Sequence, residues 1–145
     1  MDKPVSNKKK IGGVIVFVIA FAVSYFAVGH FVNGGNSDYA QLVKTSEEMN
    51  KSFPTQVDAD TRLDSTTVQE TPLTLNYHYT AVNIEKSTMT VKPEDVIKQL
   101  KEVTQQNLDT APEMAEFRSK DVSLKYSYSD KNGVFLFDYT IRPTK

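Results

Sequence analysis

The sequence predicts an α+β domain attached to a single N-terminal transmembrane helix. Three observations support this: residues 11–32 form an uncharged apolar run, four later segments alternate apolar and polar side chains, and two segments repeat apolar side chains at helical spacing. Alternation of period two indicates strands, and spacings of three and four residues indicate helices. We therefore expect the order α-β-β-α-β-β after the transmembrane helix, with a four-stranded antiparallel sheet and helices on one face.

The apolar run is long enough to cross a membrane. An α-helix needs about 20 apolar residues to span a bilayer core of about 30 Å, and residues 11–32 supply 22 without a charged side chain. No GxxxG pair is present to indicate dimerisation through the span. We divide the chain into a basic cytoplasmic N-terminus at residues 1–10, the transmembrane helix at 11–32, a tether at 33–37 and an extracytoplasmic α+β domain at 38–145.

Lysines predict the orientation of the span. Lys3 and residues 8–10 place four lysines before it, and the next basic residue is Lys44. The positive-inside rule then places the N-terminus in the cytoplasm and the C-terminal domain in the periplasm, on a single-pass protein of the inner membrane. The alternative is secretion after signal-peptide cleavage near Gly29, but the apolar run is longer than the roughly 7–15 apolar residues in the middle of a usual signal peptide. We favour the uncleaved anchor.

Charge and cysteine content narrow the function further. Residues 1–32 contain four Lys and one Asp, a net charge of +3, whereas residues 33–145 contain thirteen Lys and Arg against seventeen Asp and Glu, a net charge of −4. Nucleic-acid binding requires clustered basic residues, so we expect no nucleic-acid partner. The chain has no cysteine, which excludes a disulfide or a lipidated cysteine and favours a bacterial envelope over a eukaryotic secreted module.

A helix is expected after the tether. Ser37 or Asp38 can cap its first turn, and Pro54 ends it. Its apolar stripe consists of Tyr39, Leu42, Val43, Met49 and Phe53.

Two strands follow this helix. Residues 56–68 alternate Val57, Ala59, Thr61 and Leu63 with charged side chains, which predicts a half-exposed strand. Residues 73–81 form the clearest strand, and a hairpin is the simplest connection. Its apolar face carries Leu73, Leu75, Tyr77, Tyr79 and Ala81, and its other face carries Thr74, Asn76, His78 and Thr80.

A second helix begins at Pro93, which is well suited to the first helical position. Its apolar residues are Val96, Ile97, Leu100, Val103 and Leu108. We expect a break near Asp109, and a capping box at residues 110–113 that starts a short helix carrying Met114 and Phe117.

Two more strands end the chain. Residues 121–128 place Val122, Leu124, Tyr126 and Tyr128 on one face. Asn132-Gly133 predicts a tight hairpin turn. The last strand, residues 134–141, places Phe135, Phe137, Tyr139 and Ile141 on one face.

No catalytic, cofactor-binding or metal-binding residue is predicted. Asp58, Asp60 and Asp64 lack the glycine and glutamate of a calcium loop, and we interpret them as surface residues. His78 is the one histidine of the outer domain, and no nucleophile motif accompanies it. We therefore expect no enzyme activity.

Tyrosine is the one enrichment in the outer domain. Tyr77, Tyr79, Tyr126, Tyr128 and Tyr139 suit a protein interface, because a ring and a hydroxyl can serve a half-dry contact. The interpretation we favour is that they are core-facing sheet residues whose phenols reach the rim of the sheet. The opposite, wet face would carry His78, Asn76, Lys125 and Asp138, and the edge at residues 60–67 could pair with a partner strand.

The stretches QVDADTRLDS, LTLNYHYT and LKYSYSDKNG resemble a family of small uncharacterised bacterial proteins, exported or membrane-anchored. The resemblance covers about residues 53–143. It implies a bacterial origin and an exported location, and it carries no functional residue. Many members of that family have cysteines that this chain lacks, so any disulfide of the family is absent here.

The leading hypothesis is a single-span envelope protein whose outer domain binds another envelope protein as an accessory or assembly subunit. The first alternative is a ligand-binding module with a cavity between sheet and helices. The second is a small hydrolase, which would require His78 within hydrogen-bonding reach of a serine hydroxyl and a carboxylate.

Overall fold

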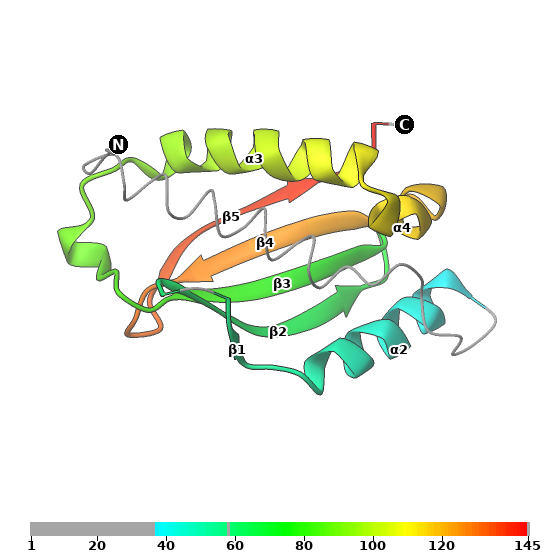
Figure 1. The fold of residues 1–145 in the computed structure, drawn as a ribbon, viewed down its shortest axis with the longest axis horizontal. Coiled ribbons are helices and arrows are strands. Elements are labelled where there is room, and N and C mark those ends of the chain that lie inside the picture. Colours follow the sequence, from blue (N-terminus) through cyan, green and yellow to red (C-terminus); the bar gives the residue numbers. More distant parts are fainter. Residues whose placement is uncertain (1–36, 58, 145) are drawn as a thin grey trace.

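The computed structural model describes residues 37–57 and 59–144. In this part of the chain two long helices lie along the two sides of one sheet (Figure 1). The helices are α2 (Asp38–Asn50), α3 (Pro93–Thr110) and α4 (Ala115–Ser119), with 3₁₀ turns η1 (Lys86–Thr88) and η2 (Pro112–Met114). The strands are β1 (Thr55–Gln56), β2 (Thr61–Gln69), β3 (Thr74–Ala81), β4 (Ser123–Ser129) and β5 (Phe135–Ile141).

The sheet is mixed. Its strands lie in chain order from β1 to β5, and neighbours pair antiparallel except β3 and β4, which are parallel. The predicted α+β class is confirmed, but the predicted four-stranded antiparallel sheet is wrong, because the sheet has five strands and one parallel pair. The helical connection explains the difference: α3 carries the chain back to the end of the sheet where β3 begins, and β4 then runs in the same direction as β3.

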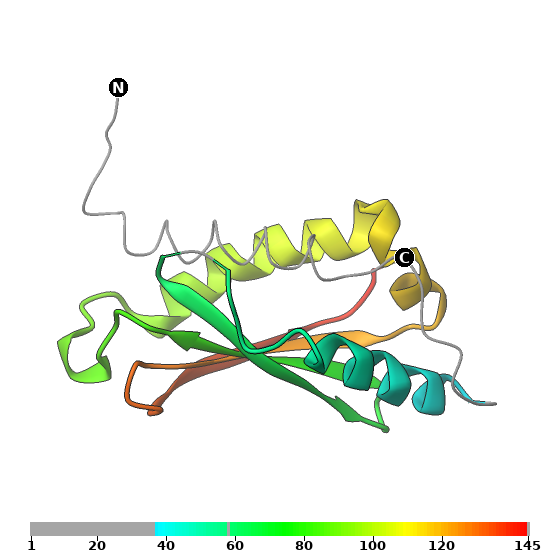
Figure 2. The same ribbon diagram turned by 60° about the horizontal axis from the view of Figure 1, so that its bottom comes forward.

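Helices α2 and α3 pack on the same face of this sheet, as the sequence predicts. The hydroxyl of Ser46 on α2 lies 2.7 Å from that of Thr66 on β2. The hydroxyl of Thr104 on α3 lies 3.3 Å from the phenol oxygen of Tyr139 on β5. Through the strand registers, both contacts fall on the side that carries the tyrosines of β3 and β4. Figure 2 shows the two helices on that side of the twisted sheet.

The start of each long helix follows the predicted cap. The side chain of Ser37 accepts a hydrogen bond from the backbone N–H of Ala40, 3.0 Å away, and Pro93 is the first residue of α3. The apolar stripe of α2 is confirmed only in part, because Leu42 and Met49 are buried whereas Tyr39 is 36% exposed. Two hydroxyl residues, Thr45 and Ser46, are buried in its place.

The predicted break after the second helix is confirmed. Helix α3 ends at Thr110, and η2 and α4 follow and bury Met114 and Phe117. The predicted capping box is wrong, because the Thr110 hydroxyl donates to the carbonyl of Gln106, 2.7 Å away. The guanidinium of Arg118 instead donates to two carbonyls at the end of α3, those of Leu108 and Ala111.

The first predicted strand is two strands. The chain turns between β1 and β2, and β1 pairs back on Arg62 and Leu63. A register shift between Leu63 and Ser65 then moves the inward position by one residue, so that Thr66 is buried after Leu63. Simple alternation could not predict this, because a bulge changes which side chains face inward.

A second bulge changes the end of the sheet. Phe137 pairs with Tyr128 and Phe135 pairs with Ser129, so Leu136 has no register partner. Phe135 is 53% exposed and Leu136 is buried. The prediction that Phe135 faces the core is therefore wrong, whereas Phe137 is confirmed on the core face together with the two alternate residues that follow it.

The hairpin between β4 and β5 is confirmed at the predicted turn. Gly133 has a φ of +83°, a conformation that favours glycine. Asp130 is buried, and its carboxylate accepts hydrogen bonds from the backbone N–H groups of Lys86, Asn132 and Val134 at 2.8–2.9 Å. These bonds, that from Lys86 foremost, lower the pKa of Asp130. One carboxylate thus ties the hairpin to the loop before α3.

The predictions for residues 1–10, 11–32 and 33–36 lie outside the described residues, as does Asp58. Among the helices that the structure does describe, none is both long and apolar enough to cross a membrane.

Candidate functional site: the tyrosine face

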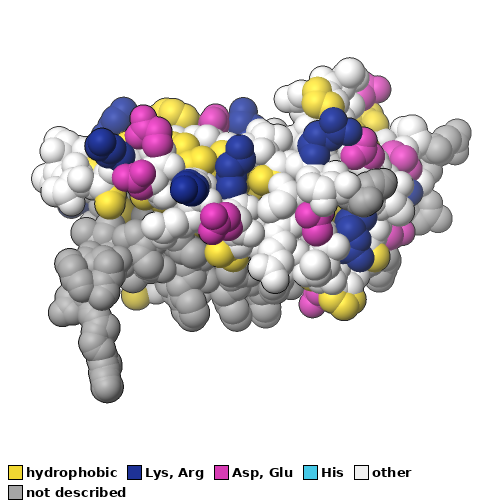
Figure 3. Space-filling model, turned by 90° about the horizontal axis from the view of Figure 1, so that it is seen from above, with side chains coloured by type: hydrophobic (Ala, Val, Ile, Leu, Met, Phe, Trp, Pro, Cys, Tyr) yellow, Lys and Arg dark blue, Asp and Glu magenta, His cyan; other side chains and the backbone are white. Residues whose placement is uncertain are grey.

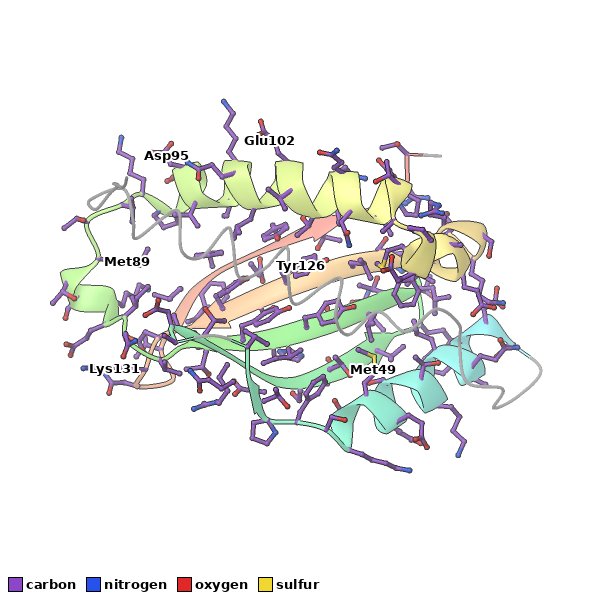
Figure 4. The ribbon with its side chains drawn as sticks, in the orientation of Figure 1. Met49, Met89, Asp95, Glu102, Tyr126 and Lys131 are labelled. Atoms are coloured by element: carbon purple, nitrogen blue, oxygen red, sulfur yellow. The ribbon has the colours of Figure 1, made fainter. Side chains whose placement is uncertain are left out.

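Five tyrosines line the centre of the sheet on the helix side. Tyr77 and Tyr79 lie on β3, Tyr126 and Tyr128 on β4, and Tyr139 on β5. We call these five residues the tyrosine face. Because β3 and β4 are parallel, Tyr77 pairs with Tyr126 and Tyr79 with Tyr128. Figure 4 shows Tyr126 in the middle of the sheet, with Met49 of α2 on one side and α3 on the other.

The rings of the tyrosine face stack across the strands. The ring centroids of Tyr77 and Tyr126 are 5.2 Å apart, and those of Tyr79 and Tyr128 are 5.0 Å apart, with interplanar angles of 15° and 13°. Tyr126 stacks on Tyr139 at 5.0 Å, and Phe137 extends the row beyond Tyr128 at 4.9 Å. Such spacings are typical of offset aromatic pairs, which stabilise a fold beyond the effect of burying their apolar area.

The phenol hydroxyls of this face are buried and mostly unpaired. The four tyrosines of β3 and β4 are 0–2% exposed, and none of their hydroxyls has a hydrogen-bond partner. Tyr139 differs, because its hydroxyl lies 3.3 Å from that of Thr104. Buried polar atoms are nearly always paired in folded proteins, so four unpaired hydroxyls on one face are unusual.

Burial also changes the acidity of these phenols. Loss of solvation raises the pKa of all five tyrosines well above the ordinary value. Nearby phenols raise the pKa of Tyr79, Tyr126 and Tyr128 further, whereas the bond to Thr104 opposes the increase at Tyr139. The face therefore stays neutral at physiological pH.

The two long helices lie over the outer strands of this face. Helix α2 packs on β2 and α3 packs on β5, and Figure 1 shows β3 and β4 between them. Met114 and Phe117 are buried where η2 and α4 lead into β4. At the entrance to α2, the ammonium of Lys120 lies 2.9 Å from the carboxylate of Asp38. The described helices thus frame the tyrosine face on its sides.

The opposite face of the sheet is polar, as the sequence predicts. His78 Nε2 lies 2.8 Å from the hydroxyl of Thr67, and Asn76 donates to the same hydroxyl at 3.3 Å. The ammonium of Lys125 on β4 lies 3.6 Å from the carboxylate of Asp138 on β5. Partial burial lowers the pKa of His78, against the opposing effect of the Asp64 carboxylate.

The predicted catalytic and cation candidates are not brought together. The hydrogen bond that the described structure gives His78 is to a threonine, not to a serine and a carboxylate. Asp60 accepts a bond from Asn83, and Asp64 is bonded by Arg62 and Thr80 on the sheet. Within residues 37–57 and 59–144, no three His, Asp or Glu side chains lie close enough to share a metal ion.

The edge at residues 60–67 is occupied, so the prediction of a free pairing edge there is wrong. Strand β1 covers Arg62 and Leu63. The side-chain amide of Asn50 then donates to the carbonyl of Thr66 at 2.9 Å and accepts from its N–H at 2.7 Å. A side chain of α2 thus satisfies a backbone position where β2 would otherwise expose an edge.

The outer surface is mixed in charge. Figure 3 looks onto the α3 side and shows Lys and Arg interspersed with Asp and Glu over the coloured atoms. An open pocket lies at the hairpin end of the sheet, away from the tyrosine face. Its lining residues are Glu85, Lys86, Ser87, Asp130, Asn132 and Val134.

The sequence indicated the tyrosines but not their arrangement. The favoured prediction, that they face the core, is confirmed, but the phenols do not reach the rim of the sheet. The polar contacts of Thr66 and Thr104 were not predicted. A usable signal was present, because Tyr-X-Tyr occurs at residues 77–79 and again at 126–128, which would suit two strands that lie side by side.

These features define a small α+β domain with one aromatic face framed by two helices. The chain belongs to the family described as a domain of unknown function (DUF8479), whose model matches residues 38–137. The match agrees with the resemblance of the sequence to a family of small uncharacterised proteins. No curated protein matches the chain.

Two solved structures are similar in fold. One is a protein of Pseudomonas aeruginosa inferred to be secreted, with a TM-score of 0.52 and 18% identity, covering 74% of this chain and 95% of that chain. The other is EpsS, the pilotin of the type 2 secretion system of Vibrio vulnificus, with a TM-score of 0.49 and 7% identity, covering 68% of this chain and 82% of that chain. At these identities no residue role is transferred from either protein.

Proposed function

We propose that this protein is an accessory or assembly subunit of a bacterial envelope, held by residues 11–32 as a single-span anchor, whose outer domain binds an apolar helix of another protein. The observation that carries the proposal is the tyrosine face. Tyrosine is enriched at protein interfaces because its ring offers a large rigid contact and its hydroxyl can bond a partner. Four such hydroxyls, two on β3 and two on β4, have no bond in the described structure.

The frame of the face fits a helical partner. Helices α2 and α3 pack on the outer strands β2 and β5, and the rings on the central strands β3 and β4 are 0–2% exposed. A partner helix could pack its apolar side on these rings only by displacing the side chains that bury them. Serine, threonine or amide side chains on that helix would bond the hydroxyls.

Location and chemistry agree with a binding role in the envelope. The lysines before residue 11 and the lack of cysteine favour an exported bacterial domain. The likeness to a protein inferred to be secreted is consistent with export. We assign the domain to binding and not to catalysis, and the threonine partner of His78 is consistent with that assignment.

Site-specific photocrosslinking in envelope membranes tests the proposal. The photoreactive phenylalanine analogue benzoylphenylalanine replaces Tyr79 or Tyr126 in the full chain, and Ser127 or His78 in the matched controls, which point to the opposite side of the same strands. We expect an adduct with an apolar helical peptide of another protein from the tyrosine positions alone. Adducts from the control positions alone, or none from any folded variant, would contradict the proposal.

A further inference from the structure

A bulge turns an aromatic side chain outward at the hairpin between β4 and β5. Strict alternation would place Phe135 on the core face with Phe137, but Leu136 has no register partner, and Leu136 and Phe137 are both buried. Phe135 is therefore 53% exposed, and its neighbour Val134 is 46% exposed, more than any other large apolar side chain of the described residues. Bulges are frequent beside functional sites because they change the direction of a side chain.

Hydrogen bonds fix the backbone that carries this exposed pair. The carboxylate of Asp130 accepts from the backbone N–H groups of Lys86 and Val134, each at 2.9 Å. The backbone N–H of Lys131 donates to the carbonyl of Ile84, also at 2.9 Å. The hairpin and the loop around η1 are thus joined into one platform. A platform that is ordered before binding loses little conformational entropy when a partner docks.

The open pocket at the hairpin adjoins the exposed pair, because Val134 forms part of its lining. Its volume is about 320 Å³. Small-molecule sites enclose most of their ligand, whereas this pocket is open to solvent beside a protruding apolar side chain. That shape suits another protein, which can cover Phe135 and place a side chain in the pocket at the same time.

The exposed charge around the pair is positive. Lys86 and Lys131 are exposed, and neither forms an ion pair with another described residue. Asp130 is 1% exposed, and three backbone N–H groups already bond its carboxylate. Two exposed ammonium groups thus stand against one half-buried carboxylate, that of Glu85. Charge complementarity then favours an acidic partner.

We infer that Val134, Phe135, Lys86 and Lys131, with the pocket beside them, form a second docking surface, which binds an acidic segment of another protein. We call it the hairpin surface. An apolar side chain of the partner packs on Phe135, and carboxylates of the same segment lie against the two lysines. Interfaces commonly combine a buried aromatic centre with a polar rim in this way. The inference goes beyond the proposed function and does not depend on the tyrosine face.

The hairpin surface lies far from the point where the chain enters the described structure. Asp38, at the start of α2, lies 2.9 Å from Lys120, which precedes β4, whereas the hairpin follows β4. The seven residues of β4 extend about 23 Å. Figure 1 shows the start of α2 and the hairpin at opposite ends of the sheet, and Figure 4 labels Lys131 at the hairpin. A protein bound there therefore approaches the domain from the side away from Asp38.

Selection of random peptides displayed on phage tests the chemistry of the partner. The bait is the full chain in dodecyl maltoside micelles. We expect the selected peptides to carry Asp or Glu next to an aromatic or aliphatic side chain. Their synthetic forms should shift the amide resonances of residues 84–88 and 130–136 in NMR spectra of the chain. Phe135→Ala should weaken their binding about tenfold or more, as expected for an anchor residue of an interface.

Charge reversal gives a second, independent readout. The double variant Lys86→Glu with Lys131→Glu should select basic peptides and lose the acidic ones. The matched control is Lys98→Glu with Lys101→Glu, which reverses two exposed charges on α3 and should leave the selection unchanged. Circular dichroism establishes that each variant is folded. No enriched peptide, peptides without carboxylates, or equal effects of the two double variants would each overturn the inference.

A fluorescent reporter separates a protein partner from a lipid surface. The chain has no tryptophan, so Phe135→Trp places a single indole on the hairpin surface. A selected peptide should shift its emission to shorter wavelength, because the peptide covers the ring. Vesicles of phosphatidylethanolamine and phosphatidylglycerol should give the same emission as micelles. A shift produced by vesicles without peptide would assign the surface to lipid and overturn the inference. Crosslinks from Tyr79 or Tyr126 report on the other face, so the two proposals fail separately.

Discussion

At the residue scale, the hydroxyl of Tyr126 is buried without a hydrogen bond. A buried polar group that lacks a partner costs about 1–3 kcal/mol, whereas replacing it by an apolar group of the same shape is neutral or stabilising. We therefore expect Tyr126→Phe to leave the free energy of unfolding of the full chain unchanged or to raise it by about 1 kcal/mol. Urea denaturation followed by circular dichroism measures this.

Tyr139→Phe is the matched control on the neighbouring strand. Its ring stacks on that of Tyr126, but its hydroxyl has Thr104 as a partner. Loss of this hydrogen bond should lower the free energy of unfolding by about 1 kcal/mol. Equal losses from both substitutions would show that the hydroxyl of Tyr126 is bonded in solution.

The five tyrosines also predict how stability depends on alkaline pH. Burial raises the pKa of each above that of an unfolded tyrosine, which is about 10. As pH rises through about 10, the unfolded chain releases these protons first, so the free energy of unfolding falls with pH. Each phenol contributes about 1.4 kcal/mol per pH unit, and five together about 7.

Domains of this size have a free energy of unfolding of about 5–15 kcal/mol. At the loss per pH unit given above, we expect the chain to unfold cooperatively within about one to two pH units above pH 10. Tyrosine absorbance at 295 nm and far-ultraviolet circular dichroism should change together. In Tyr126→Phe the free energy of unfolding should fall less steeply with pH, because one phenol fewer releases a proton on unfolding. A gradual rise in absorbance while the domain remains folded would contradict the burial of the phenols.

At the element scale, Asn50 attaches the end of α2 to the edge of β2. Its side chain bonds both backbone groups of Thr66, and substitution by alanine would leave both without that partner. We expect Asn50→Ala to lower the free energy of unfolding by about 2–3 kcal/mol, since each bond is worth about 1 kcal/mol and unpaired groups cost more. Urea denaturation measures the change.

Glu47→Ala is the control on the same helix, because Glu47 is exposed and its carboxylate lies 4.0 Å from the ammonium of Lys44. An exposed ion pair contributes about 0–1 kcal/mol, so this change should be near neutral. Asn50→Asp should fall between the two variants, because a carboxylate can still accept from the N–H of Thr66. If alanine at position 50 costs no more than at position 47, Asn50 does not secure the edge.

The elements show how far the sequence could predict the structure. Caps and turns depend on neighbouring residues, and Ser37, Pro93 and Gly133 occupy the predicted positions. The bulges at Ser65 and Leu136 depend on how strands pair, and no local pattern marks them. They moved Thr66 into the core face and Phe135 out of it.

At the scale of the whole molecule, the arrangement of the two hairpins decides the site. Alternating segments predict strands but not which strands are neighbours, and the parallel pairing of β3 with β4 is what stacks Tyr77 on Tyr126. The sequence therefore identified the tyrosines as inward-facing and left their assembly into one face undetermined.

The anchor prediction concerns the whole chain and has a direct test. If residues 11–32 span the inner membrane uncleaved, the chain should stay in the membrane fraction after an alkaline carbonate wash, with a mass near that of the 16.3 kDa sequence. A C-terminal alkaline phosphatase fusion should be active, because that enzyme requires export.

A charge within the span tests the same prediction. Val18→Asp places a carboxylate at mid-span, where it costs about 2.5–3.5 kcal/mol of insertion free energy, and it should shift the chain toward the soluble fraction. Val57→Asp, in the outer domain, should not. A soluble wild-type product shortened by about 29 residues would establish the signal peptide instead, and an inactive fusion would place the domain in the cytosol.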